Sequence, residues 1–108
     1  MDTRLRLTTD DLFLLGACFM SCKQRLVDIR EPGALVICDR IDAIATAIQA
    51  GQPLTRSQAQ ETAACVEAVR RKVRKDSVMN IRQRRIVLDT CERLIQMFTA
   101  EEISNVRT

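Results

Sequence analysis

Residues 70–85, RRKVRKDSVMNIRQRR, decide how the second half of this chain folds. They carry eight Lys and Arg side chains and one acid, so the stretch has a net charge of +7 in a chain whose total is only +3. Asp76 and Ser77 at its centre are weak helix formers. Asn80, with Gln83 three residues later, can cap a new helix. The stretch therefore lies either inside one long helix or at a turn between two helices.

The lengths of the neighbouring segments favour the turn. One helix from Arg56 to Phe98 would be about 64 Å long, whereas the two helices expected before it are only about 32 and 25 Å long. Those helices could not cover the long one side by side in a monomer, although a dimer would tolerate it. We therefore predict a break near residues 76–79.

The first half of the chain predicts two helices. Thr9, followed by Asp10 and Asp11, is a helix start with a hydroxyl cap and acids in the first turn. Glu31-Pro32-Gly33 ends this helix, because the residue before proline is pushed out of the α region. Gly51 ends the second helix with a left-handed cap. An apolar stripe at heptad-like spacing should form the buried face of the first helix: Leu12, Leu15, Phe19, Cys22, Leu26 and Ile29.

No residue from Leu12 to Met20 is charged, so this half of the first helix should be the most buried part of the domain. We expect Phe13, Met20 and Val27 to widen its buried face beyond a narrow seam. On the third helix, Thr55 and Gln58 fit a capping box. The small side chains of its stripe would let it lie close to a neighbouring helix.

These patterns predict an all-α fold, a single domain over residues 1–108 built as an antiparallel four-helix bundle. A short C-terminal helix could follow from Thr99, and residues 1–8 and 107–108 should be loosely ordered. The heptad stripes also make a homodimer plausible. The expected helices span residues 10–30, 34–50, 56–75 and 80–98.

The chain contains five cysteines, an odd number without disulfide-like spacing, and most of them have apolar neighbours. This usage is typical of free thiols in a reducing compartment and predicts a cytoplasmic protein. The LGAC sequence ending at Cys18 resembles a lipoprotein cleavage box. Asp10 and Asp11, however, shorten the apolar segment before it, so we expect a buried helix there. No apolar run approaches the ~20 residues of a membrane helix.

The chain has no histidine, which removes the commonest general base, histidine-based zinc sites and histidine phosphotransfer. It also lacks the glycine-rich nucleotide-binding motifs. We therefore expect no enzymatic activity and no cofactor. Asp39 and Asp42 lie one helical turn apart, but Arg40 between them favours a solvated face over acid–base or Mg²⁺ chemistry. Cys18 and Cys22 could ligate a soft metal, but without a CxxC motif no metal site is predicted.

The basic stretch has three interpretations: a solvated face, a nucleic-acid surface, or a docking surface for an acidic protein. Six of its eight cations are Arg, which contacts carboxylates in bidentate fashion and so favours protein docking. Without Tyr or Trp, stacking on single-stranded bases is disfavoured, although contacts to a nucleic-acid backbone stay open. The residues predicted to bind a partner are Arg71, Arg74, Lys75, Arg82, Arg84 and Arg85.

Helical angles divide this set. Arg71, Arg74, Lys75 and Arg82 should point outward. Arg70, Lys72 and Arg85 should flank the core, and Arg84 should point to the apolar side of its helix. An unpaired buried guanidinium is costly, so Arg84 needs a carboxylate inside or outside the chain. The sequence thus predicts a small adaptor, chaperone or inhibitor that docks an acidic partner. The alternative is a regulator that binds a nucleic-acid backbone through the same surface. The sequence does not identify the partner.

Overall fold

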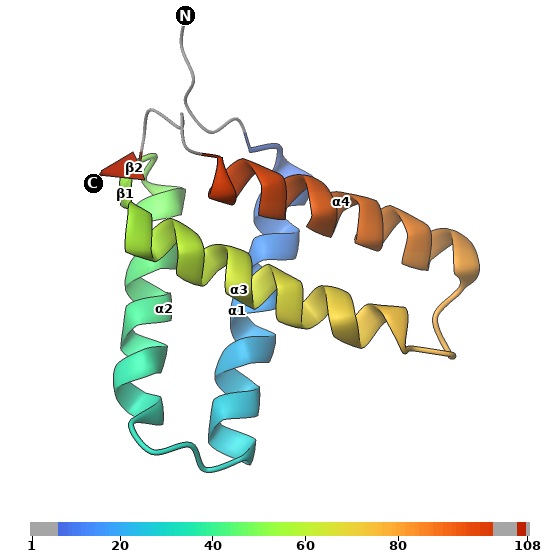
Figure 1. The fold of residues 1–108 in the computed structure, drawn as a ribbon, viewed down its shortest axis with the longest axis horizontal. Helices are drawn as coiled ribbons and strands as arrows, with labels where there is room; N and C mark the ends of the chain where they lie inside the picture. The colour runs from blue at the N-terminus through green and yellow to red at the C-terminus, as the bar shows by residue number, and fades with distance from the viewer. Residues whose placement is uncertain (1–6, 101–105, 108) are drawn as a thin grey trace, which may run out of the picture.

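The computed structural model describes residues 7–100 and 106–107, and in this part of the chain four helices and one short strand pair form (Figure 1). The predicted all-α helical bundle is confirmed. The elements are α1 (Thr9–Asp28), α2 (Ala34–Gln49), β1 (Leu54–Thr55), α3 (Arg56–Arg74), α4 (Ile81–Thr99) and β2 (Val106–Arg107).

The break predicted between the third and fourth helices is also confirmed, because α3 ends at Arg74 and α4 begins at Ile81. The predicted capping box of Thr55 and Gln58 opens α3, and Gly51 has the left-handed φ of 68° expected after α2. At the start of α1 the cap lies one residue earlier than predicted. The Thr8 hydroxyl accepts the Asp11 N–H, and the Asp11 carboxylate accepts the Thr8 N–H.

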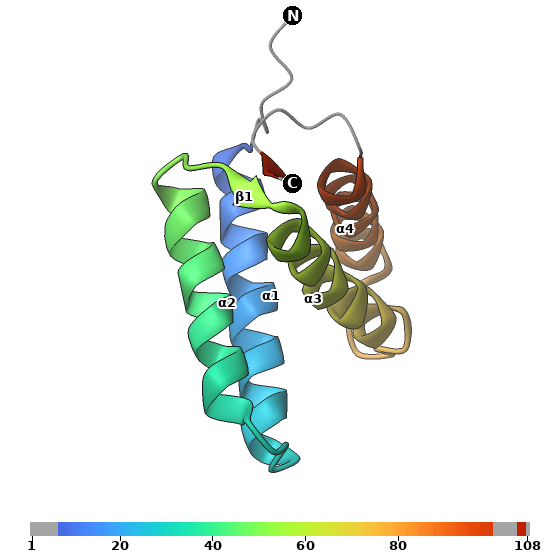
Figure 2. The same ribbon diagram turned by 60° about the vertical axis from the view of Figure 1, so that its left-hand side comes forward.

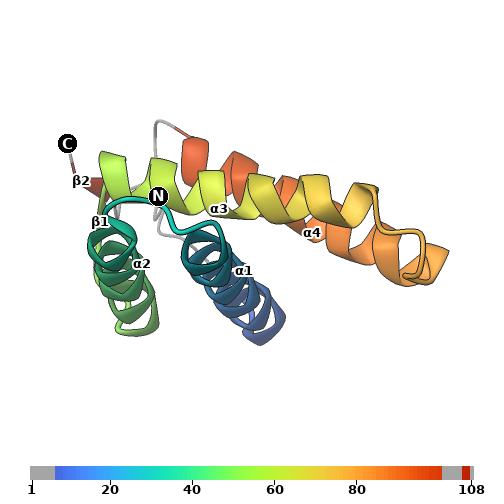
Figure 3. The same ribbon diagram turned by 90° about the horizontal axis from the view of Figure 1, so that it is seen from below.

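The four helices form two antiparallel hairpins that lie across one another. In Figures 1 and 2, α1 and α2 run side by side, and α3 crosses this pair with α4 beside it. Helix α3 is central to the fold because it packs against α1, α2 and, most extensively, α4. Seen from below in Figure 3, the outer end of the α3–α4 hairpin extends past α1 and α2. The turn between α3 and α4 is therefore carried away from the rest of the molecule.

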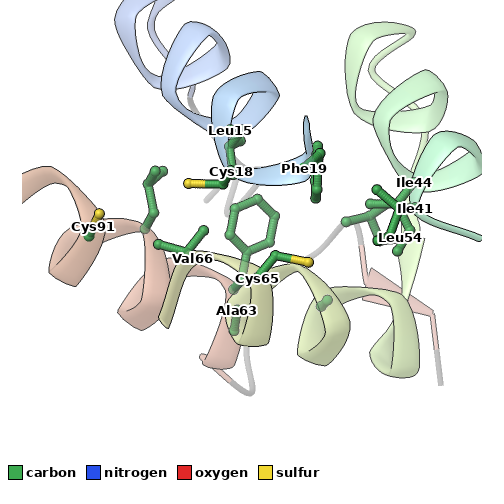
Figure 4. Packing of buried hydrophobic residues seen from close by; sticks show 13 residues of the cluster. Leu15, Cys18, Phe19, Ile41, Ile44, Leu54, Ala63, Cys65, Val66 and Cys91 are labelled. Atoms are coloured by element: carbon green, nitrogen blue, oxygen red, sulfur yellow. The ribbon is translucent and has the colours of Figure 1, made fainter. Parts of the chain in front are cut away.

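The core fills the space where the hairpins cross. Figure 4 shows Leu15 and Phe19 of α1 facing the α3 side chains, with Ile44 of α2 and Leu54 of β1 beside them. Small buried residues on α3, such as Ala63, allow the close packing expected of that helix. Burial of these apolar side chains is the main favourable contribution to folding.

The buried face of α1 is narrower than expected. Leu12 and Ile29 of the predicted apolar stripe are 38% and 53% exposed, and the segment from Leu12 to Met20 is not buried throughout. Phe13, Met20 and Val27 do not widen the buried face but are 81%, 72% and 56% exposed. They lie on the side of α1 opposite Leu15 and Cys18, because a helix turns ~100° per residue. Helix α1 packs chiefly against α2 and α3, and neither neighbour covers this side.

The possible short helix after Thr99 falls mainly on residues 101–105, outside the described part of the chain. Val106 and Arg107 form β2, which pairs in parallel with Leu54 and Thr55 of β1. Among the helices described, none has the length and apolar character needed to cross a membrane.

Candidate protein-interaction site

The turn between α3 and α4 is built by side chains of the basic stretch itself. The Asp76 carboxylate oxygen Oδ1 accepts hydrogen bonds from the backbone N–H groups of Val78 at 2.9 Å and Met79 at 3.2 Å. The Asn80 side-chain oxygen then accepts the N–H of Arg82 at 2.8 Å and caps α4. Asx turns and caps of this kind fix a chain reversal without glycine or proline.

Arg84 completes this turn. Its Nη2 donates to the backbone carbonyl oxygens of Asp76 and, at 3.5 Å, Met79. The carboxylate partner considered for Arg84 is thus replaced by two carbonyl groups of its own turn. Its Nε is buried and has no hydrogen-bond acceptor among the described residues. Arg84 therefore stabilises the turn through Nη2, which contacts backbone carbonyl oxygens of its own chain.

One carboxylate serves two cations on α3. Glu67 forms an ion pair with Arg70 at 2.8 Å between Oε2 and Nη2, and with Arg71 at 3.2 Å between Oε1 and Nε. Burial alone would raise the pKa of Glu67, but the hydrogen bonds and charges of Arg70 and Arg71 lower it below its usual value. Arg71 keeps most of its guanidinium in solvent, with 73% of its side chain exposed.

The outer end of the hairpin, residues 74–85, is called the hairpin tip here. Its turn and the first residue of α4 also expose two branched apolar side chains, Val78 at 93% and Ile81 at 82%. Among the described residues, four exposed cations of the hairpin tip have no carboxylate partner: Arg74, Lys75, Arg82 and Arg85.

A second basic feature is an open groove of about 770 Å³ between the C-terminal halves of α1 and α3. We call it the α1–α3 groove. It brings together three cations of the basic stretch with one from α1, namely Arg71, Lys72, Lys75 and Arg25. Helical angles placed Lys72 only at the flank of the core. Arg25 was not predicted, because the sequence does not show which face of α1 meets α3.

The other lining of the α1–α3 groove is partly apolar. It includes Cys22 of α1, Ile29 directly after α1, and Ala68 and Val69 of α3. One acid, Asp28, also borders the groove and accepts a hydrogen bond from Gln24 at 2.8 Å. The groove thus combines four cations, one acid and an apolar surface.

The thiol of Cys22 lines this groove. As a thiol it donates to the backbone carbonyl of Cys65 at 3.6 Å. A hydrogen bond with the Cys65 side chain lowers the pKa of Cys22 to about 7, burial opposes this change, and the positive charge of Arg25 adds to it. The same interaction and burial raise the pKa of Cys65. Cys22 is therefore the thiol of this pair that ionises first.

Cys18, Cys65 and Cys91 fit the role of small core residues. Cys18, within the LGAC sequence, has no exposed surface, and burial raises its pKa to about 12. Cys65 and Cys91 are also buried, and all five cysteines are free thiols. In the described part of the chain, no group of three or more His, Cys, Asp or Glu side chains is placed to hold a metal ion.

The acids on α2 take part in ion pairs or face solvent. Asp42 pairs with Lys23 of α1 at 2.6 Å, and Arg40 pairs with Glu61 of α3 at 2.6 Å. Asp39 is exposed, in agreement with the solvated face expected for this segment. These contacts link α2 to its neighbours and leave no paired carboxylates in a cleft.

Sequence reasoning missed one buried charge. Asp11, with 1% of its surface exposed, forms an ion pair with Arg93 of α4. Burial alone would raise the pKa of Asp11, but hydrogen bonds from Arg93 and Thr8 lower it below the usual value. No local signal marks this pair, because the two residues are 82 positions apart.

Comparisons with protein-family models, curated proteins and solved structures find no match to this chain. The fold itself defines the class: an all-α bundle of two crossed helical hairpins with cations gathered at one hairpin tip and in one groove.

Proposed function

We propose that this protein is a non-enzymatic interaction module, acting as a small adaptor, chaperone or inhibitor, that docks an acidic partner protein through its basic surface. The observation that carries the proposal is the hairpin tip. Its four exposed cations have no carboxylate partner in the described chain, and they lie at the projecting end of α3 and α4. An acidic partner would supply the missing counter-charges.

The exposed apolar side chains favour a protein over a purely solvated face. Val78 and Ile81 lie within the hairpin tip and leave almost their whole surface in water. Three of the four unpaired cations, Arg74, Arg82 and Arg85, are Arg, which forms forked hydrogen bonds with carboxylates. An interface with an apolar centre and a charged rim would use both features.

A displayed library of random peptides tests this proposal. We expect wild-type protein to enrich acidic peptides that contain apolar residues, and at least one group of these peptides to bind the double variant Arg82→Glu/Arg85→Glu more than about tenfold more weakly, or ~1.4 kcal/mol. The matched control, Arg30→Glu/Arg56→Glu, has the same charge change away from the hairpin tip and should bind within about twofold of wild type. Enrichment without acidic peptides would contradict the proposal.

The alternative function is contact with a nucleic-acid backbone through the same exposed cations. The affinity for random duplex DNA, measured at two salt concentrations, tests this alternative. Log affinity falls with log salt concentration, and each phosphate that the protein neutralises makes the slope steeper by about 0.9. A slope of several units would favour the alternative. Absence of binding at low salt would exclude it.

We place this activity in the cytoplasm. The support is that all five cysteines are free thiols, which persist in a reducing compartment. The heptad-like stripes favour a homodimer, but the small residues Ala59, Thr62 and Val66 on α3 are buried inside this chain. Exposed apolar side chains, such as Phe13 and Met20 on α1, support self-association.

A further inference from the structure

The α1–α3 groove has an excess of positive charge that the described chain does not neutralise. Arg25, Lys72 and Lys75 have no carboxylate ion-pair partner among the residues described, and Arg71 shares Glu67 with Arg70. Against these four cations the groove has one lining acid, Asp28. A ligand that enters the groove therefore meets a positive potential, which attracts negative groups.

Cations border the groove from both helices. Arg25 belongs to α1, whereas Arg71 and Lys72 belong to α3 and Lys75 directly follows it. Apolar lining also comes from both helices, with Cys22 on α1 and Val69 on α3. A fitting ligand thus needs an apolar strip flanked by negative groups on both sides. Phosphate groups alone would leave the apolar lining unused.

We propose that the α1–α3 groove binds an acidic amphipathic helix of a partner protein. The apolar stripe of that helix would contact Cys22 and Val69, and its carboxylates would pair with Arg25, Lys72 and Lys75. Helices commonly bind grooves in this way, through apolar residues spaced three and four apart. The inference rests on the proposed function, and it adds a second contact site beside the hairpin tip and the shape of the partner segment that would occupy it.

Cys22 provides a direct probe of occupancy, because it lines the groove and has a pKa lowered to about 7. Iodoacetamide should alkylate it near neutral pH. A helix seated in the groove should block this reaction. Cys38, a partly exposed thiol on α2 outside the groove lining, serves as the internal control.

The test uses three synthetic peptides of about 16 residues, roughly four helical turns. The first has Leu at positions three and four apart with Glu on both flanks. The second has the same composition in an order that destroys the apolar stripe, and the third has Lys in place of Glu. Alkylation of each cysteine is followed by mass spectrometry, and affinity by fluorescence anisotropy.

We expect the first peptide to slow alkylation of Cys22 at least about fivefold and to leave Cys38 unchanged, whereas the other two peptides protect neither thiol. Arg25→Glu/Lys72→Glu should weaken binding about tenfold or more, a change that corresponds to one decade in Kd. The hairpin-tip variant Arg82→Glu/Arg85→Glu should bind this peptide within about twofold of wild type. Circular dichroism checks the fold of each variant, and Arg25→Gln/Lys72→Gln replaces the groove variant if the charge reversal unfolds it.

Two results would overturn this inference and leave the proposed function standing. One is equal affinity for the acidic peptide with the apolar stripe and for the acidic peptide of scrambled order, which would show that charge alone attracts the peptides. The other is loss of binding in the hairpin-tip variant but not in the groove variant. Protection of Cys22 by random duplex DNA and not by the acidic peptide would assign the groove to nucleic acid. Failure of every acidic peptide to bind would count against both proposals.

Discussion

At the scale of single residues, Asp11 has two roles. Its carboxylate closes the capping box with Thr8 at the start of α1, and it also pairs with Arg93 of α4. A carboxylate with 1% exposure needs such partners, because an unpaired buried charge is strongly unfavourable. The ion pair joins the first helix to the last.

We predict that Arg93→Met lowers the free energy of unfolding by about 1–2 kcal/mol at neutral pH, a modest value because Arg93 is half exposed. The pKa of Asp11 is lowered in the folded protein, so its stabilising effect is present above the unfolded pKa of about 3.9. That effect is lost as the pH falls through the lower folded pKa. Urea unfolding at pH 7 and in acid should therefore show that the difference from wild type shrinks in acid.

Glu92→Gln, the neighbouring exposed position, is the control for this prediction and should change stability by less than about 0.5 kcal/mol. If Arg93→Met loses as much free energy of unfolding in acid as at pH 7, relative to wild type, the variant has lost packing and not the charge interaction.

At the scale of elements, the α3–α4 hairpin depends on a turn that contains neither glycine nor proline. The Asp76 carboxylate accepts hydrogen bonds from two backbone N–H groups, and the Asn80 side chain caps α4. Arg84 donates to the backbone carbonyl oxygens of Asp76 and Met79. The cations at the start of α4 are unfavourable for its dipole. Arg84 offsets part of this cost by binding backbone carbonyl groups of the turn.

Arg84→Met should destabilise the protein by about 1–2 kcal/mol, since two carbonyl groups of the turn lose a charged donor. The loss should be local, so hydrogen exchange should quicken most at residues 76–82. Arg85→Met removes the same charge from an exposed neighbour and should be close to neutral. If residues 76–82 show the same hydrogen-exchange rates in both variants, the hydrogen bonds from Arg84 do not stabilise the turn.

At the scale of the whole molecule, the two hairpins share one core. Leu94 of α4 and Leu15 of α1 are both buried in the same cluster, together with Ile44 of α2. Neither hairpin can bury its apolar face without the other. The domain should therefore unfold in one cooperative step.

Leu94→Ala is expected to lower the free energy of unfolding by about 2–5 kcal/mol, the range for a leucine truncated in a packed core. Leu35→Ala removes the same atoms from a site that is 79% exposed and should cost less than about 0.5 kcal/mol. Chemical denaturation followed by circular dichroism measures both. Two separate unfolding transitions in Leu94→Ala would show that the two hairpins unfold independently.

The sequence by itself determined the helices and the turn between α3 and α4. Their ends are set by local chemistry: Pro32, Gly51, the capping box at Thr55, and the pair Asp76 and Asn80 act on backbone within a few residues. Such signals can be recognised without knowing what lies across the fold.

Only the tertiary structure decided which helix faces meet. The apolar periodicity of α1 predicts which side of the helix is buried, but it does not show how much of the helix surface the neighbouring helices cover. Phe13 and Met20 were therefore wrongly expected to be buried. The crossing of the hairpins likewise brings Arg25 beside Lys72 and forms the α1–α3 groove. The physical reason is that helical periodicity fixes directions around one axis, whereas a groove or a distant ion pair depends on how two axes are placed.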